Sequence, residues 1–265
     1  MKALLGDYPV TRAFKQKSSL QFADVKVPNT AFKRVVRELE FDVAELAIVT
    51  FLLAKAHGKP LRLLPAVVTA RFQHPLLVTA KGVGPNDLEG KRVGQRSYSV
   101  TTAAWVRGIL AEDYGVNLDR VKWVTFEEPH VAEFRDPPNV ERAAAGKDMT
   151  AMLLSGELDA AVVGEPPKDE RIKPVIADPA AAAEAWKKKH RAIQINHMVT
   201  VKNNVSKAQA DEIYAGLLES RKAAGNPEMN PFGVEENRRN LEAAIDCVHR
   251  QRMIPRRFSA EELFQ

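Results

Sequence analysis

Three side chains stand at positions where proton transfer is chemically feasible. His197 forms with Asn196 a polar pair inside an otherwise apolar strand. His74 lies next to another predicted strand, and Glu45 closes a third. Imidazole has a pKa of about 6.5, so two histidines can serve as acid and base near neutrality. These three are the candidate catalytic residues. The alternative for each histidine is a structural hydrogen bond; for Glu45 it is an ion pair with Arg12 or a cap on the following helix.

The stretch Gly90–Gly108 has the pattern of a turn that binds anions. A short strand over Lys91–Gly94 leads through a polar turn into a predicted helix over Val100–Tyr114. The free N–H groups and partial positive charge of a helix N-terminus favour a carboxylate, although an ordinary βα turn has the same pattern. Hydroxyl groups here are expected to cap the helix and contact the ligand. The candidate binding residues are Ser97, Tyr98, Ser99 and Thr101.

Arg12 follows the first predicted strand and is the candidate for anchoring a substrate carboxylate, because a guanidinium can offer two parallel N–H donors to it. An exposed arginine without such a role is the alternative. Neither a His pair at i, i+4 nor a Cys-x-x-Cys motif is present, so no cofactor is expected. A divalent metal shared by Glu45, His74 and His197 stays an open alternative.

Strands and helices alternate along the chain, which predicts an α/β fold with parallel sheets covered by helices. The predicted strands are Ala3–Leu5, Asp24–Val27, Phe41–Leu46, Leu61–Val68, Leu76–Thr79, Lys91–Gly94, Val121–Thr125, Leu158–Val163 and Ile193–Val201. The predicted helices are Thr11–Lys17, Asn29–Glu38, Ile48–His57, Val100–Tyr114, Asp148–Ser155, Ala180–Lys189, Ser206–Ala223 and Glu235–Gln251. Glu127–Gly146 is polar and is expected to be a long loop.

The order of these elements indicates two lobes. One is expected to combine residues 1–78 with 198–265, and the other to span residues 79–197. Two crossing strands, near Leu76–Thr79 and Ile195–Thr200, would join them as hinges. A ligand is expected in the cleft between the lobes, at the carboxyl ends of strands.

The composition is that of a globular protein, with 45% hydrophobic and 28% charged residues among 265. The net charge of +5 is scattered, without a basic stripe interleaved with aromatic residues, so nucleic acid is not an expected partner. No apolar run is long enough for a membrane span, and Lys2–Leu5 does not open an export signal, so a cytoplasmic location is expected. Homo-oligomerisation is possible. The single cysteine, Cys247, excludes an internal disulfide.

Several stretches together resemble one family. They are Gly6-Asp7-Tyr8 with Thr11-Arg12, Phe41–Glu45, Phe72 with His74, Gly90–Gly108, Tyr114-Gly115-Val116, Ile195–Val199 and the region 237–263. In this order they resemble the 4,5-dihydroxyphthalate decarboxylases over nearly the whole chain. The resemblance implies the fold of type 2 periplasmic binding proteins, with two α/β lobes, two hinge strands and the ligand in the cleft. It also implies removal of one carboxylate from a dihydroxylated phthalate, which yields protocatechuate.

The resemblance adds four substrate-binding candidates within or beside these motifs, which are Asp7, Tyr8, Arg71 and Asn196. The sequence departs from the family's pattern at two loops. The family usually has Glu and Gln where Ser97 and Ser99 stand, and Thr-Gly-Gly where Thr125–Glu128 stands. These loops are expected to face the cleft. We therefore expect 4,5-dihydroxyphthalate or a related acid as the substrate.

The function expected from the resemblance is decarboxylation of a hydroxylated aromatic acid. A phenol ortho or para to the reacting carbon supplies electrons, an acid protonates that carbon as CO2 leaves, and in principle no metal is required. The alternative is a solute-binding protein that captures an aromatic or other small carboxylate, because many proteins of this architecture bind ligands without turning them over.

Overall fold

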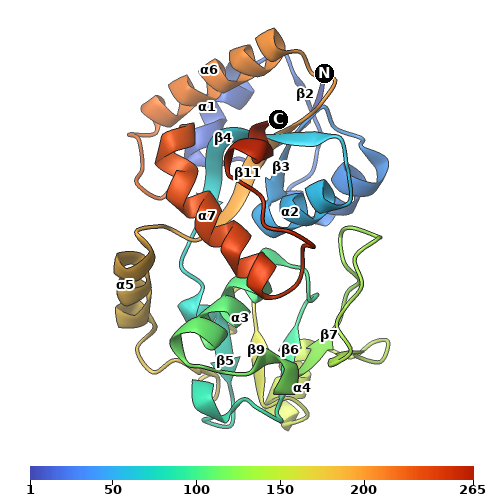
Figure 1. The fold of residues 1–265 in the computed structure, drawn as a ribbon, viewed down its shortest axis with the longest axis vertical. Coiled ribbons are helices and arrows are strands. Elements are labelled where there is room, and N and C mark those ends of the chain that lie inside the picture. Colours follow the sequence, from blue (N-terminus) through green and yellow to red (C-terminus); the bar gives the residue numbers. More distant parts are fainter. The chain divides into compact units, whose positions relative to one another are not determined.

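The computed structural model describes residues 1–265, which form two compact units (Figure 1). Unit 1 comprises Met1–Arg71, His130–Glu133 and Ala192–Gln265, and unit 2 comprises Phe72–Pro129 and Phe134–Arg191. Each unit has its own sheet and its own apolar core. The α/β fold class expected from the sequence is confirmed. None of the helices combines the length and apolar character needed to cross a bilayer.

The boundaries between the two units differ from the predicted ones, which were placed after residues 78 and 197. The chain leaves unit 1 after Arg71, contributes His130–Glu133 to it, and returns to it after Arg191. Strand β11 (Ile195–Lys202) pairs with strand β4 (Leu61–Ala70) from its first residue onward, so it belongs to unit 1 along its whole length. Strand β5 (Leu77–Thr79) pairs only within unit 2. Strand pairing, which the sequence does not reveal, therefore sets the boundaries.

The sheet of unit 1 has the strand order β2-β1-β3-β11-β4. Strand β1 (Lys2–Leu4) runs parallel to β2 (Gln21–Phe22) and to β3 (Val43–Ala47). Strand β11 runs antiparallel to both β3 and β4, which corrects the prediction of an all-parallel sheet. The reason is chain direction: β4 ends just before the chain leaves the unit, and β11 begins just after it returns.

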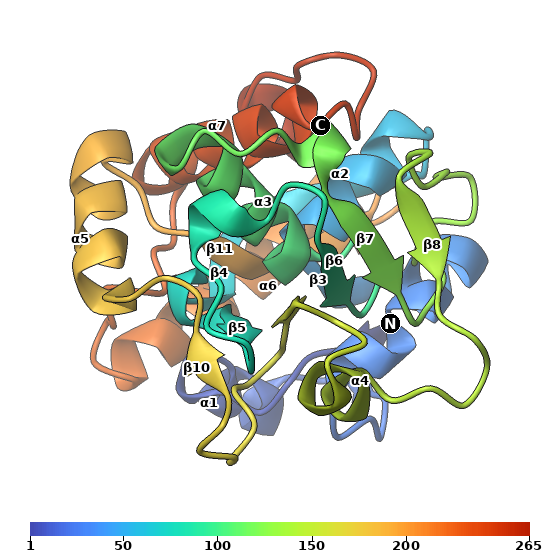
Figure 2. The same ribbon diagram turned by 90° about the horizontal axis from the view of Figure 1, so that it is seen from below.

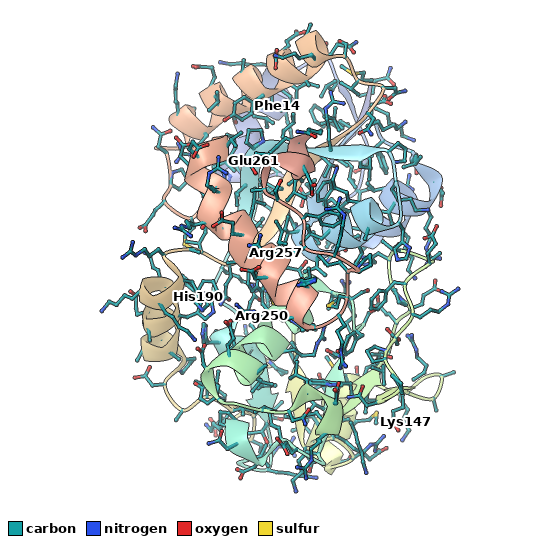
Figure 3. The ribbon with its side chains drawn as sticks, in the orientation of Figure 1. Phe14, Lys147, His190, Arg250, Arg257 and Glu261 are labelled. Carbon is teal, nitrogen blue, oxygen red and sulfur yellow. The ribbon has the colours of Figure 1, made fainter.

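One face of this sheet is covered by α1 (Pro9–Lys17) and α6 (Lys207–Ala223), whose apolar side chains share a core with alternate residues of the strands. Phe14, labelled in Figure 3, packs between these helices. A Cβ on Gly216 would lie 2.7 Å from the Phe14 ring, so glycine allows this close approach. The helices α2 (Ile48–Ala56) and α7 (Val234–Arg250) contact each other and β11.

The sheet of unit 2 has the strand order β10-β5-β9-β6-β7-β8, and Figure 2 labels all of these strands except β9. Its remaining strands are β6 (Arg92–Gln95), β7 (Lys122–Thr125), β8 (Val140–Arg142), β9 (Ala160–Val162) and β10 (Lys173–Pro174). Its helices are α3 (Thr101–Asp113), α4 (Met149–Ser155) and α5 (Pro179–His190). Strand β8 lies inside the stretch predicted as one long loop, and it extends the parallel part of the sheet beside β7. Strands β5 and β10 are antiparallel to their neighbours.

The segment before β3 differs from its prediction. No strand forms over 24–27, and the predicted helix up to Glu38 is a 3-10 turn, η1 (Pro28–Ala31), followed by a π-helical turn, η2 (Arg34–Glu38). Leu39 ends the turn in the left-handed region, with φ of 50°. The other short helical turns are η3 (His74–Leu76), η4 (Pro85–Asp87), η5 (Leu118–Arg120) and η6 (Glu261–Phe264). Ser259 and Glu262 form a capping box ahead of η6, in which each backbone N–H donates to the other residue's side chain.

Candidate active site

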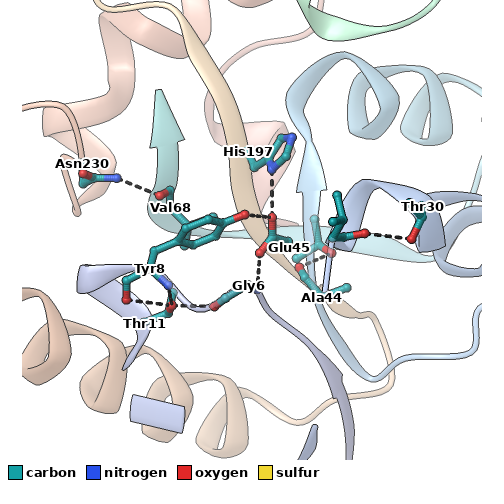
Figure 4. A network of polar contacts seen from close by, with 11 residues as sticks. Gly6, Tyr8, Thr11, Thr30, Ala44, Glu45, Val68, His197 and Asn230 are labelled. Atoms are coloured by element: carbon teal, nitrogen blue, oxygen red, sulfur yellow. Dashed lines mark hydrogen bonds and ion pairs between the residues drawn. The ribbon is translucent and has the colours of Figure 1, made fainter. Parts of the chain in front are cut away.

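Glu45 and His197 meet on one face of the unit 1 sheet. In the antiparallel pairing of β3 with β11, Val199 lies opposite Glu45 and His197 lies opposite Ala47. Side chains two residues apart share a face, so Glu45 and His197 are diagonal neighbours. His197 Nδ1 lies 2.8 Å from Glu45 Oε1 (Figure 4). The register thus joins two of the three predicted catalytic residues, which are 152 positions apart.

Glu45 is completely buried and its carboxylate is surrounded by donors. The backbone N–H of Gly6 donates to Oε2 at 2.5 Å, and the Tyr8 hydroxyl donates to Oε1 at 2.9 Å. Neither alternative raised for Glu45 occurs: Arg12 pairs with Asp7, and α2 begins without a side-chain cap. A buried carboxylate is costly unless it accepts hydrogen bonds, and Glu45 accepts two from the turn between β1 and α1.

The hydrogen bonds around Glu45 indicate where the protons of Tyr8 and His197 lie. Burial, together with the Glu45 charge, raises the pKa of Tyr8 above its ordinary value, so this phenol keeps its proton and donates. Glu45 Oε1 therefore acts as an acceptor, and the His197 Nδ1 that faces it carries a proton. The second ring nitrogen, Nε2, is left to exchange a proton with a ligand. His197 retains 18% side-chain exposure, while Glu45 has none.

A tight turn between β1 and α1 places Tyr8 over Glu45. Thr11 Oγ1 accepts the Tyr8 N–H at 3.0 Å and donates to the Gly6 carbonyl at 2.7 Å. Pro9 opens α1 with a fixed φ. A Cβ on Gly6 would lie 2.4 Å from the Tyr8 ring, so only glycine lets the ring fold back. The predicted substrate-binding residue Tyr8 therefore contacts Glu45.

A second histidine, His130, lies near this network and is not among the residues predicted from the sequence. It is 5% exposed, and its Nδ1 lies 2.9 Å from the Thr50 hydroxyl. Arg37 Nε donates to the His130 carbonyl at 2.8 Å. The buried Phe32 ring contacts His197 and His130 edge-on, with centroid distances of 5.1 and 5.7 Å. No sequence signal marks His130, because it follows proline in a polar stretch.

The other candidates in unit 1 lie in different surroundings. Arg12 Nε donates to Asp7 at 3.0 Å, and both side chains are more than half exposed. Asn196 is buried beside His197 in β11. Arg71 is exposed at the end of the unit, where its backbone N–H donates to the Gln194 carbonyl. The Arg12 guanidinium is therefore accessible to solvent. Its exposed ion pair with Asp7 contributes little stability, so a ligand can replace Asp7 at small cost.

The candidates at the start of α3 belong to unit 2 and are all buried. Ser97 Oγ and Ser99 Oγ lie 3.4 Å apart, and Val100 occupies the N-cap without a side-chain cap. The predicted Ser/Thr cap is therefore wrong. The Arg107 guanidinium stacks on the Tyr98 ring, with Arg107 Cζ 3.6 Å from the ring centroid. Arg107 also donates a hydrogen bond to the Tyr98 carbonyl. This part of the turn is fixed by a buried arginine.

His74 also lies in unit 2, in η3, and is 1% exposed. Neither ring nitrogen has a hydrogen-bond partner. Burial lowers the pKa of His74 to about 4, because the charged imidazolium is poorly solvated there. At neutral pH the ring is therefore uncharged, so His74 fits a neutral hydrogen-bonding role better than that of a charged proton donor.

We expect His74 to make the protein less stable in acid. Its pKa is below the unfolded value, so the unfolded chain binds the proton first, and stability falls as the pH decreases from about 6.5 toward 4. His74→Phe should weaken this dependence in urea unfolding measured across that range. The exposed His57, changed to glutamine, is the control. Identical pH profiles for wild type and His74→Phe would contradict the expectation.

No group of three or more His, Cys, Asp or Glu side chains is arranged to hold a metal ion. Glu45 and His197 share unit 1, and His74 belongs to unit 2. The predicted lack of a cofactor stays a prediction.

The fold is that of the periplasmic binding proteins. The aliphatic sulphonate binding protein SsuA of Escherichia coli matches with a TM-score of 0.58 at 9% identity, over 100% of this chain and 96% of that one. The ligand-binding component of an ABC-type import system from Staphylococcus aureus matches with a TM-score of 0.57, also at 9% identity, over 100% and 96%. At such identities the likeness establishes the fold alone.

Within this fold class, sequence relatives define the family. A 4,5-dihydroxyphthalate decarboxylase from Pseudomonas putida is 30% identical over 189 residues, which cover 65% of this chain and 72% of that protein. The protein of the same name from Comamonas testosteroni is 28% identical over 195 residues, 68% of this chain and 59% of the relative. The chain thus spans less than two thirds of the latter. No family model matches. The chain belongs to the 4,5-dihydroxyphthalate decarboxylase family, as its motifs predicted.

Proposed function

We propose that this chain decarboxylates a hydroxylated aromatic acid, with 4,5-dihydroxyphthalate or a close relative as the substrate. The observation that carries the proposal is the Glu45–His197 pair, found in a member of a family whose characterised relatives are named for this reaction. A buried carboxylate that orients an imidazole, with the other ring nitrogen left for a ligand, is an arrangement for proton transfer.

The chemistry needs one proton and no external electrons. In 4,5-dihydroxyphthalate each carboxylate is para to a hydroxyl, which pushes electron density onto the carbon that bears the carboxylate. His197 Nε2–H protonates that carbon, and the ring transiently loses its aromaticity. The bond to the carboxylate then breaks, its electron pair restores the ring, and CO2 leaves with 3,4-dihydroxybenzoate as the product. Solvent returns the proton to His197. Glu45 stabilises the charged imidazole by its negative charge.

This scheme includes no cofactor, because the substrate's own phenol supplies the electrons and regains them when the bond to the carboxylate breaks. A cytoplasmic location is also part of the proposal, together with a small aromatic carboxylate as the ligand. The hydroxyl groups at the start of α3 are proposed to bind the substrate within unit 2, where a helix N-terminus favours a carboxylate.

Arg12 is proposed to anchor the carboxylate that stays on the ring. Arg12→Ala is expected to raise KM about tenfold and to leave kcat nearly unchanged, because the contact exists in both the ground state and the transition state. Arg239, another exposed arginine paired with a carboxylate in unit 1, supplies the control variant Arg239→Ala. An unaltered KM in Arg12→Ala would remove Arg12 from the site.

The substrate is identified by measuring CO2 release and ultraviolet spectra with a panel of acids. The panel contains 4,5-dihydroxyphthalate, phthalate, monohydroxylated benzoates and benzoate. We expect turnover only where a hydroxyl is ortho or para to a carboxylate. Tight binding measured by calorimetry without CO2 from any acid would favour a solute-binding protein instead.

A further inference from the structure

The Tyr8 hydroxyl has one hydrogen-bond partner, the carboxylate of Glu45. Its oxygen lies 2.9 Å from Glu45 Oε1, the same atom that faces His197 Nδ1 at 2.8 Å (Figure 4). Two donors from different segments, the turn before α1 and strand β11, therefore share one acceptor atom. The two hydrogen bonds compete for the negative charge on this oxygen, so strengthening one of them weakens the other.

The position of Tyr8 is fixed by its surroundings. Its ring lies against the backbone of Gly6, and its N–H is held by Thr11. Pro9 restricts the backbone directly after it. The phenol also stays protonated, since burial and the Glu45 charge raise the pKa of Tyr8. Tyr8 is therefore a permanent donor to Glu45.

We infer that Tyr8 is a positioning residue that acts through Glu45, and that it tunes the acid strength of His197 instead of contacting the substrate. By sharing Glu45 Oε1, the Tyr8 hydroxyl weakens the hold of the carboxylate on the imidazolium. His197 then releases its proton to the ring carbon more readily. The expected effect on kcat rests on the proposed decarboxylation. The expected effect on the titration of the His197 ring does not.

The surroundings of His197 within unit 1 contain few other titratable groups. Strand β3 contributes Glu45, and the start of α1 contributes Tyr8. Strand β4 places Thr69, which does not titrate, opposite His197. The ring of His130, like that of His197, contacts the Phe32 ring. A change at Tyr8 should thus reach His197 mainly through Glu45.

The test is Tyr8→Phe, which removes only the hydroxyl. The midpoint of the His197 ring titration, followed by its 15N resonances, should move to higher pH by about half a pH unit. With 4,5-dihydroxyphthalate we expect kcat to fall about two- to threefold, because an acid weaker by half a pH unit protonates the ring carbon at most about threefold more slowly. KM should stay unchanged, because the substrate does not touch Tyr8. Tyr214→Phe is the matched control, since Tyr214 is a half-buried tyrosine of the same unit that packs on Phe232.

Two results would overturn the inference. An unmoved His197 titration in Tyr8→Phe would show that the hydroxyl does not act through Glu45. A raised KM with unchanged kcat would make Tyr8 a substrate-binding residue. If no acid is decarboxylated by the wild-type protein but the titration still moves, the proposed function fails and the link between Tyr8 and His197 stands. If decarboxylation occurs but the titration does not move, only the inference about Tyr8 fails.

Discussion

His197→Gln is expected to lower kcat about 100-fold or more while the protein still binds its substrate. Glutamine has nearly the reach of histidine and can still donate to Glu45, but its amide cannot deliver a proton to a ring carbon. The loss should appear in kcat rather than KM, because protonation occurs only in the transition state. Steady-state kinetics and calorimetry with 4,5-dihydroxyphthalate measure the two quantities.

His249→Gln provides the matched control, since this partly buried histidine lies on α7 of the same unit, outside the network. Its kcat should equal that of the wild type. If His197→Gln turns over at the wild-type rate, His197 is not the proton donor and the proposed mechanism is wrong.

Glu45→Gln is expected to have an effect of similar size for a different reason. The substitution removes the negative charge that stabilises the imidazolium. The amide oxygen is needed at the Oε2 position to accept the Gly6 N–H, so the new N–H2 group lies at the Oε1 position, where it faces the donors from Tyr8 and His197. An amide donor opposite Nδ1 favours the imidazole tautomer with its proton on Nε2, which leaves no charged acid. We expect kcat to fall about 100-fold or more, and stability to fall by about 1–3 kcal/mol because a buried donor loses its acceptor.

The 15N spectrum of His197 checks the tautomer, and urea unfolding checks the stability. Glu40→Gln is the control, because Glu40 is a partly buried glutamate of the same unit that pairs with Arg34 away from His197. A Glu45→Gln variant with wild-type kcat would show that the carboxylate has no part in the proton transfer.

The two residues of the Glu45–His197 pair could be singled out from the sequence, but their contact could not. Glu45 and His197 each stand out as a polar residue within an apolar strand. Their contact depends on the register of β11 against β3, and a register between segments far apart in the chain leaves no mark in either segment. The contact of Tyr8 with Glu45 was also hidden, because a motif does not show that the Tyr8 ring folds back over Gly6.

Most elements were predictable, and the failures have local causes. Strong periodicity marked α1, α2, α6 and α7 within one or two residues of their ends. The segment before β3 has helical spacing but forms a π-helical turn, in which Arg37 binds the carbonyl of His130. That tertiary contact overrides the local pattern. The strand β8 was missed because its three residues are partly or fully exposed and carry no apolar alternation.

A single-turnover experiment tests the central claim most directly. Excess protein is mixed with 4,5-dihydroxyphthalate, and CO2 and the aromatic product are quantified after quenching. The proposed function predicts one equivalent each of CO2 and 3,4-dihydroxybenzoate per substrate consumed, and a much slower appearance of both with His197→Gln. Recovery of intact, bound dicarboxylate from the wild-type protein would contradict it and would make the chain a binding protein for this acid.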